Sequence, residues 1–149
     1  TETGITEPQT TFSPCFGAPF LPLPPQRYAE MLGDRVEKHN ANVYLVNTGW
    51  TAGPYGEGHR IELNYTRAMI TAALSGALEK VQFTPHPLFQ VEIPESCPDV
   101  PTKILDPKNT WKDPEAYERN AQELAQRFEE NSKRFSDVSE DILNAGPHQ

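Results

Sequence analysis

The residues best placed to do chemistry lie in a glycine-rich loop with the outline of a phosphate-binding loop. Gly53 and Gly58 have the glycine spacing of the G-x-x-x-x-G-K-[ST] motif, in which backbone N–H groups and a lysine bind nucleotide phosphates. His59, however, stands where that lysine is required, and Arg60 replaces the hydroxyl residue that holds Mg²⁺. Glu57 also brings a negative charge to the place of the phosphates. The loop therefore lacks the residues that phosphate binding of this kind requires.

The rest of the sequence contains no complete catalytic or metal-binding pattern. It has no nucleophile elbow, no histidine between a serine and an acid, and no cluster at metal-ligand spacing. His39 fits a surface position at a helix end, because no second ligand lies at a useful spacing from it. Cys15 lies among aromatic residues without a neighbouring cation, which favours a buried, unreactive thiol. On these residues alone, we interpret the chain as a nucleotide-binding half-site.

A strand, the glycine loop and a helix form the unit that must position these residues. Val43 to Val46 is continuously apolar within the segment Asn42 to Asn47, which is typical of a strand covered on both faces, as in a parallel sheet. Asn64 to Leu78 has helical spacing, with Asn64 as its N-cap and Gly76 near its end. The apolar face of this helix is predicted to be Thr66, Met69, Ile70, Ala73, Leu74 and Ala77. Because a helix N-terminus at a sheet edge commonly binds nucleotides, we predict an α/β domain with a nucleotide-facing loop.

The N-terminal segments predict a proline-rich connection followed by one helix. The apolar residues between Thr1 and Pro25 predict an ordered and buried connection, whose prolines exclude a regular helix. A helix should follow from Pro25 to His39, where the proline suits the first turn and Asn40 suits a left-handed cap. One apolar stripe of this helix is expected to be buried, namely Tyr28, Met31, Leu32 and Val36.

The C-terminal half predicts a strand, an extended arm and a long helix. Leu88 to Ile93 alternates as in a strand with one solvent-facing side, and His86 before it is expected to be exposed. Pro94 to Trp111 contains four prolines and predicts an extended arm. Asp113-Pro114-Glu115 is typical of a helix start. The long amphipathic helix that follows has an acidic face best explained as solvated rather than as a metal or basic-partner surface. Its apolar face is predicted to be Tyr117, Ala121, Leu124, Ala125, Phe128 and Phe135. A short helical turn is predicted from Asp137 to Asn144. The anchor points of the arm are expected to be Ile104, Leu105 and Trp111.

Length, charge and cysteine content limit the classes of protein to consider. With 149 residues the chain suits one domain, and its 36% apolar residues and 15 prolines predict many loops. A formal net charge of −8 argues against nucleic acids and anionic membranes as partners. Two cysteines suit a reducing compartment, and the sequence has neither a signal-peptide pattern nor a membrane-spanning apolar run. We therefore expect a soluble cytoplasmic protein and, because it starts at Thr1 rather than Met, part of a longer chain.

Several ordered strings of residues lie along nearly the whole chain. They are Gly4-Ile-Thr-Glu-Pro-Gln9, Thr11-Phe-Ser-Pro-Cys-Phe-Gly17, Tyr28-Ala-Glu30, Leu45-Val-Asn-Thr-Gly-Trp50, Arg60-Ile61, Tyr65-Thr-Arg-Ala68, Ser75-Gly76, Pro101 with Ile104-Leu-Asp-Pro107, Asn109-Thr-Trp111 and Ala145-Gly-Pro147. These strings resemble the C-terminal part of the ATP-dependent phosphoenolpyruvate carboxykinases. The GTP-dependent carboxykinases do not share the strings in this form.

The resemblance implies the fold and the reaction of that family. Residues 1–149 would form one adenine-side portion at the C-terminus of the carboxykinase mononucleotide-binding domain, with a mixed sheet flanked by helices and a long amphipathic helix at its end. The implied enzyme of gluconeogenesis, a lyase and decarboxylase, converts oxaloacetate and ATP into phosphoenolpyruvate, ADP and carbon dioxide. Its phosphate loop and its ligands for Mg²⁺ and Mn²⁺ would lie upstream of Thr1, so the segment alone is expected to be inactive. The alternative is a stand-alone adenine-nucleotide-binding or interaction module without catalysis.

The resemblance assigns an adenine pocket to this chain, and no catalytic or metal-binding residue. Arg60 would stack its guanidinium on the base while still donating hydrogen bonds. Ile61 would supply apolar contact and backbone polar groups, and the Thr66 hydroxyl would bind the purine rim. From the residues alone, a surface charge at Arg60 and a helix-start residue at Thr66 remain the simpler explanation.

Three further positions bear on this resemblance: one departs from the family and two match it. His59 stands where the family commonly has lysine, which predicts a changed affinity or pH dependence of nucleotide binding. Cys15 and Phe20 match a family segment that runs close to the active site, so the resemblance gives them a secondary role there.

Overall fold

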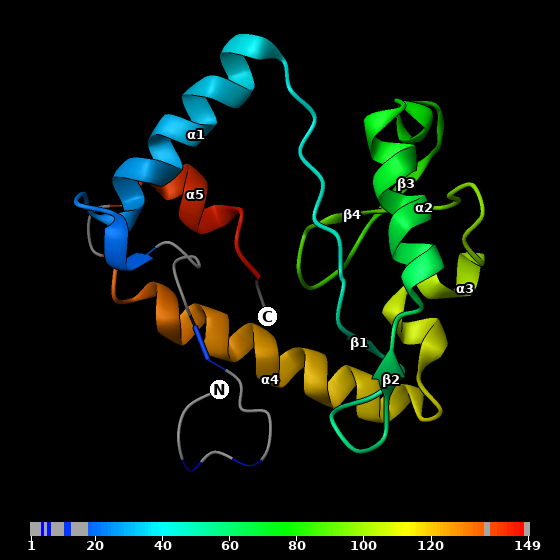
Figure 1. Cartoon of the computed structure of the whole chain (residues 1–149). Coiled ribbons are helices and arrows are strands. Elements are labelled where there is room, and N and C mark those ends of the chain that lie inside the picture. The colour runs from blue at the N-terminus through cyan, green and yellow to red at the C-terminus, as the bar shows by residue number, and fades with distance from the viewer. Residues whose placement is uncertain (1–3, 5, 7–10, 13–17, 136–137, 148–149) are drawn as a thin grey trace.

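The chain combines helices with two small hairpins (Figure 1). The computed structural model describes residues 4, 6, 11–12, 18–135 and 138–147. The helices are α1 (Pro25–His39), α2 (Leu63–Leu74), α3 (Thr102–Leu105), α4 (Pro114–Ser132) and α5 (Glu140–Asn144), with short 3₁₀ helices η1 (Ala18–Phe20), η2 (Ala77–Lys80) and η3 (Pro107–Thr110). The strands are β1 (Trp50–Thr51), β2 (His59–Arg60), β3 (Phe83–Pro85) and β4 (Glu92–Pro94). In Figure 1, α1 and α5 lie on one side, α2 and both hairpins on the other, and α4 runs beneath.

Two separate two-stranded sheets replace the mixed sheet that the family resemblance implied. β1 pairs with β2 and β3 pairs with β4, both antiparallel, and no strand joins the two pairs among the described residues. The β3–β4 register places Phe83 opposite Pro94 and Thr84 opposite Ile93. The sequence is therefore right about a mixture of helix and strand and wrong about a single mixed sheet.

The segment 42–47 is extended but pairs with no strand in the described part of the chain, so the prediction of a buried parallel strand is wrong here. Tyr44 and Val46 are half-buried, whereas Val43 is 63% and Leu45 is 86% exposed. Tyr44 packs against the core. An apolar run becomes a buried strand only where neighbouring strands take its backbone hydrogen bonds, and the described residues supply none.

The core lies where α2 meets the segments that follow it. Its buried members come from α2, η2 and the turn before α3, and half-buried apolar residues of α2, the β3 strand and α3 pack around them. An isolated bridge between Cys97 and Val100 holds that turn in place. The buried members are Ala72, Leu78, Cys97 and Val100.

α2 starts two residues earlier than predicted, counted at its N-cap, and it also ends earlier. Its N-cap is Glu62 rather than Asn64, and the helix stops at Leu74. Gly76 then adopts φ +72°, the left-handed conformation that favours glycine after a helix, and η2 follows directly. Because only Thr66 and Ala72 are fully buried, the predicted apolar face is partly wrong: Leu74 is 84% exposed.

α1 begins and ends where the sequence predicts. Pro25 is its first residue, and Asn40 caps it with φ 47° and ψ 48°. The prediction of a buried stripe is wrong for the described residues, since Met31 and Leu32 are exposed and the other two members are only half-buried.

The predicted buried connection before α1 is wrong for its described part. Phe20, in η1, is 85% exposed, and Leu23 is also exposed. Cys15 lies outside the described residues. Phe12 is held against α4, with its ring centroid 5.1 Å from that of Phe128.

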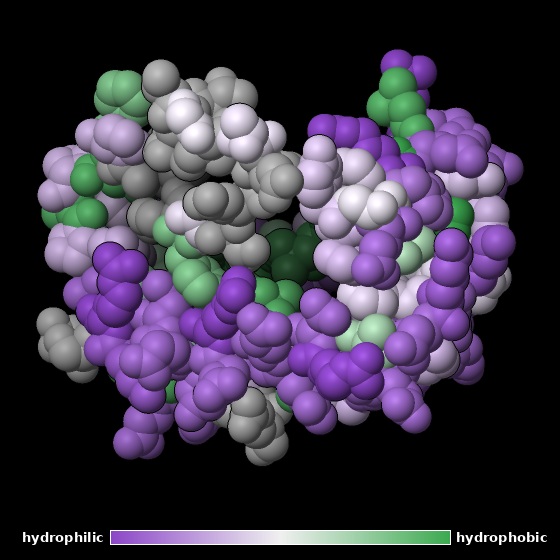
Figure 2. All heavy atoms as spheres, turned by 90° about the horizontal axis from the view of Figure 1, so that it is seen from below, coloured by the Kyte–Doolittle hydropathy of each residue, from purple (hydrophilic) through white to green (hydrophobic). Residues whose placement is uncertain are grey.

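α4 follows the predicted start at Asp113. The Asp113 carboxylate accepts a hydrogen bond from the Glu115 backbone N–H at 2.9 Å, as an N-cap should. Tyr117, Ala121 and Ala125 are buried, all within the predicted apolar face. Figure 2, which views the molecule from the α4 side, shows a largely hydrophilic surface with hydrophobic atoms visible in the hollow behind it.

Residues 94 to 111 form short helices rather than an extended arm. The prolines do not prevent this, because Pro101 is the N-cap of α3 and Pro107 is the first residue of η3, positions where a missing N–H costs little. The predicted anchors hold: Ile104 and Leu105 pack against the core, and the Trp111 ring lies edge-on to Tyr117 at 5.7 Å.

Candidate functional site

The β1–β2 hairpin positions the arginine that the sequence singled out. Trp50 lies opposite Arg60, and Thr51 lies opposite His59. The Ile61 N–H then donates to the Gly49 carbonyl at 2.9 Å, which extends the pairing beyond the two strands. Arg60 is therefore held at its backbone on a hairpin edge, and the residue is exposed to solvent.

The glycine loop folds tightly enough to require glycine at two positions. Gly53 has φ +142°, a conformation that other residues rarely adopt. A Cβ at Gly58 would overlap the carbonyl oxygens of Gly53 and Thr51, so the two sides of the loop approach within backbone contact. The loop then enters β2 before α2 begins at Leu63, which differs from a phosphate-binding loop that leads directly into its helix.

The hydroxyl of Thr110 anchors the hairpin to η3. It donates to the Pro107 carbonyl at 2.6 Å, so its lone pairs accept from the Ala52 N–H at 3.1 Å and from the Thr51 hydroxyl at 3.2 Å. Asp106 in turn accepts from the Lys108 N–H, which fixes the start of η3. The hairpin thus depends on residues far along the chain.

One aromatic ring lies against the Arg60 side chain, and a second ring packs on the first. Its guanidinium carbon lies over the Trp50 ring, 5.8 Å from the centroid, within the range of a cation–π interaction. Tyr55, in the loop, packs edge-on against Trp50 with centroids 5.6 Å apart. The hairpin therefore presents a planar cation on an aromatic support.

The three predicted adenine-site residues differ in their exposure to solvent. Arg60 is exposed and Ile61, directly after it, is half-buried. Thr66 lies in the first turns of α2, is only 7% exposed, and donates its backbone N–H to the Glu62 carbonyl. A ligand must therefore approach α2 closely to reach the Thr66 hydroxyl.

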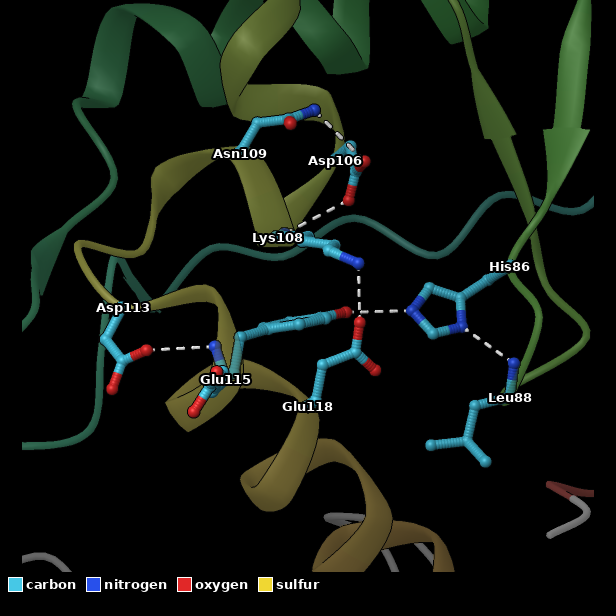
Figure 3. A network of polar contacts seen from close by, with 9 residues as sticks. His86, Leu88, Asp106, Lys108, Asn109, Asp113, Glu115 and Glu118 are labelled. Carbon is cyan, nitrogen blue, oxygen red and sulfur yellow. Dashed lines mark hydrogen bonds and ion pairs between the residues drawn. The ribbon is translucent and has the colours of Figure 1, made fainter.

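A second polar cluster surrounds His86, which the sequence wrongly predicted to be exposed (Figure 3). His86 is 9% exposed, and its Nδ1 accepts from the N–H groups of Leu88 and Phe89 at 3.1 and 3.2 Å. Its Nε2 therefore carries the proton and donates to the Tyr117 hydroxyl at 2.8 Å. The partner lies 31 residues away, so local sequence held no signal for this burial.

The His86 cluster borders a cavity of about 370 Å³ between the β3–β4 hairpin, η3 and α4. Burial, followed by the negative charges of Asp106 and Glu118, raises the pKa of the Tyr117 hydroxyl. The hydrogen bond to Glu118 at 2.5 Å, together with its charge, raises the pKa of Lys108. Both shifts favour the protonated forms, so this cluster keeps a neutral tyrosine and a charged lysine.

In the described part of the chain, no group of three or more His, Cys, Asp or Glu residues is arranged to hold a metal ion. Among the described helices, none is both long and apolar enough to cross a membrane. Burial, followed by the charge of Asp99, raises the pKa of the Cys97 thiol, which keeps that buried cysteine protonated.

Comparison with known proteins identifies the family. The family model described as phosphoenolpyruvate carboxykinase matches residues 1–103. The chain belongs to the ATP-dependent phosphoenolpyruvate carboxykinase family. It is 63% identical over 147 residues to the phosphoenolpyruvate carboxykinase (ATP) of Caldanaerobacter subterraneus subsp. tengcongensis, and that match covers 99% of this chain. It is 58% identical over 146 residues, 98% of the chain, to a carboxykinase (ATP) of Moorella thermoacetica and to that of Bacillus cereus strain G9842.

The chain spans 28% of the length of each of these carboxykinases. The matched region includes the whole β1–β2 hairpin and α2. Trp50 and Thr110 lie inside strings that carried the resemblance, but no local pattern assigns them a role. Their contacts to Arg60 and to the hairpin backbone become visible only in three dimensions.

Proposed function

We propose that this chain provides the adenine side of the ATP site of an ATP-dependent phosphoenolpyruvate carboxykinase. The enzyme would convert oxaloacetate and ATP into phosphoenolpyruvate, ADP and carbon dioxide, a step of gluconeogenesis in the cytoplasm. The observation that carries the proposal is Arg60: its guanidinium lies over an aromatic ring on an exposed hairpin edge, inside the region that matches the family.

In this proposal, Arg60, Ile61 and Thr66 bind adenine by stacking and by hydrogen bonds. A guanidinium stacks on a purine face and retains donors for the sugar or phosphates. The Ile61 N–H is already bonded to Gly49, but its carbonyl accepts no hydrogen bond from the described residues. That carbonyl suits the exocyclic amine of adenine, which is a donor, and Thr66 would close the pocket at the purine rim.

The rest of the catalytic machinery belongs, in this proposal, to the part of the carboxykinase that this chain does not cover. A phosphoryl transfer needs cations around the phosphates, and here the glycine loop has Glu57 and no lysine. Mg²⁺ and Mn²⁺, when bound, would neutralise the transferring phosphoryl group through ligands in that other part. The chain alone would therefore be inactive, and nucleic acids and membranes are not expected partners.

The test uses a composite enzyme, defined as the Caldanaerobacter carboxykinase with its matched region replaced by this chain. We expect the composite enzyme to be active, and Arg60→Ala to raise its KM for ATP by about tenfold, because one partly desolvated stacking cation is removed. Arg35→Ala, which removes an exposed arginine from α1, is the matched control and should leave that KM unchanged. An unchanged KM in Arg60→Ala would contradict the adenine role.

Calorimetry on the 149-residue chain tests the alternative of a stand-alone nucleotide-binding module. If the phosphate-binding half is indispensable, ATP should bind far more weakly than in the composite enzyme. Micromolar binding to the chain alone would favour the independent module instead.

A further inference from the structure

Arg60 rests on Trp50, and the two residues are paired across the hairpin. They are direct neighbours in the β1–β2 register, and the Arg60 guanidinium carbon lies 5.8 Å from the centre of the indole ring. At this distance the positive charge is attracted by the electron-rich face of the indole. A long and flexible side chain is thus held in one orientation by a contact within the same hairpin.

Trp50 is itself held in place from several directions. Its carbonyl accepts from the Asn47 side-chain amide at 3.0 Å, and the Asn47 side-chain oxygen accepts from the Gly49 N–H at 2.9 Å. Tyr55 lies against the indole edge-on, with an interplanar angle of 89°. On the following residues, Thr110 fixes the strand through Thr51 and Ala52. The indole is therefore a firm support rather than a mobile surface residue.

We propose that Trp50 is a positioning residue of the adenine site, a role that rests on the proposed function above. The indole holds the Arg60 guanidinium so that its other face is free, and the base stacks on that face in the order indole, guanidinium, base. Fixing an arginine on binding costs side-chain entropy, and a guanidinium already held against an aromatic ring avoids part of that cost. Trp50 acts through Arg60 and need not touch the nucleotide.

The experiment is a double-mutant cycle in the composite enzyme. Trp50→Ala should raise the KM for ATP about threefold to fivefold with kcat unchanged, as expected when one exposed cation–π contact is lost. Trp50→Phe keeps an aromatic face and should restore most of the affinity. In the Arg60→Ala background, Trp50→Ala should cause no further loss, because the residue that it positions is already absent.

A second readout separates positioning from a general structural role. Inorganic tripolyphosphate carries the phosphates of ATP without the base, so its inhibition constant should not change in Trp50→Ala. Trp111→Phe alters the other tryptophan, which packs on Tyr117, and should leave the KM for ATP unchanged. In the 149-residue chain, the Arg60 side-chain protons should shift upfield in NMR spectra through the indole ring current, and Trp50→Leu should abolish that shift.

Each outcome decides between the two proposals. If Arg60→Ala does not affect ATP affinity, the adenine role itself fails, and the role of Trp50 fails with it. If Arg60→Ala weakens ATP binding but Trp50→Ala does not, only the positioning role is overturned. Additive losses would mean that Trp50 acts independently of Arg60, and weaker tripolyphosphate binding or a lower kcat would mean that Trp50 only supports the fold. Additive losses, weaker tripolyphosphate binding, a lower kcat or the absence of an upfield shift would each overturn the proposal.

Discussion

At the scale of single residues, the hydrogen bond between His86 and Tyr117 shows how one tautomer can tie a hairpin to a helix. The imidazole uses both nitrogens, Nδ1 for the two N–H groups of its own turn and Nε2 for the tyrosine of α4. Both residues are buried, so neither can exchange this partner for water without cost.

Tyr117→Phe should destabilise the chain by about 1–3 kcal/mol, because the buried His86 Nε2–H loses its acceptor. The measurement is urea-induced unfolding at neutral pH, followed by circular dichroism. Tyr65→Phe is the matched control, since Tyr65 is a half-buried tyrosine at the core whose hydroxyl bonds to none of the described residues. Equal effects of the two variants would contradict the assigned tautomer and its role.

The raised pKa of Tyr117 predicts a pH dependence of stability. Burial disfavours the phenolate in the folded state, whereas the unfolded chain releases the proton near the ordinary pKa of 10.0. The contribution is therefore fully present below pH 10 and is lost as the pH rises through the higher folded pKa. The free energy of unfolding should fall above pH 10, and it should fall less steeply in Tyr117→Phe.

Cys97 should also lower the free energy of unfolding as the pH rises, starting from a lower pH, because burial raises the pKa of its thiol as well. The Tyr117→Phe variant should therefore retain a weaker decline that begins nearer pH 9. A profile unchanged by the substitution would show that Tyr117 is not the group responsible.

At the scale of elements, the sequence predicted what local chemistry determines and missed what distant partners determine. α1 and α4 begin at their prolines, and α1 ends at its Asn40 cap, signals that act within one helical turn. The end of α4 at Ser132 has no such signal, and the predicted helix residue Phe135 lies beyond it. The 42–47 strand was wrong because a strand needs neighbours, and these are absent from the described residues. α3 and η3 were missed because proline at a helix start resembles proline in an extended arm.

The same distinction applies to the candidate site. The resemblance selected Arg60 and Ile61 by motif, and the structure places both at one hairpin edge. The support from Trp50 and the anchor from Thr110 depend on ring orientation and on a contact across 58 residues. No local sequence pattern predicts either of these two contacts.

Gly58→Ala should destabilise the β1–β2 hairpin by about 1–3 kcal/mol, because the new methyl group would overlap two carbonyl oxygens of the loop. Gly33→Ala is a matched control within α1, where a Cβ meets open space. That change should stabilise the chain by up to about 1 kcal/mol through helix propensity. Thermal unfolding of both variants tests the prediction, and a harmless Gly58→Ala would refute the close approach of the loop strands.

At the scale of the whole molecule, several large apolar residues are exposed, and the chain spans only 28% of the length of the carboxykinases that it matches. Both observations suit a chain that packs against further carboxykinase residues. Phe20 lies in η1, Leu45 in the extended segment 42–47 and Leu74 at the end of α2. Each of these residues is at least 84% exposed. Packing these side chains against another part of the protein would be favourable, because it removes apolar area from water. In the composite enzyme, we expect the remaining carboxykinase residues to cover it.

Hydrogen exchange measures this directly. Amides 43–46 should exchange rapidly in the 149-residue chain, since the segment pairs with no strand among the described residues. In the composite enzyme they should become protected as neighbouring strands accept and donate backbone hydrogen bonds. Amides of α4 serve as the internal control, because they are already bonded within the helix. Rapid exchange in both proteins would show that the segment stays unpaired.

The hydroxyl of Thr110 also sets an order of events during synthesis on the ribosome. The hairpin can pair its own strands once Arg60 has emerged, but its anchor lies 58 residues beyond Ala52. Until that threonine leaves the exit tunnel, the hairpin would lack its hydrogen bonds to η3. The hairpin edge that carries Arg60 would therefore become rigid only after η3 has formed, well after its own two strands have been made.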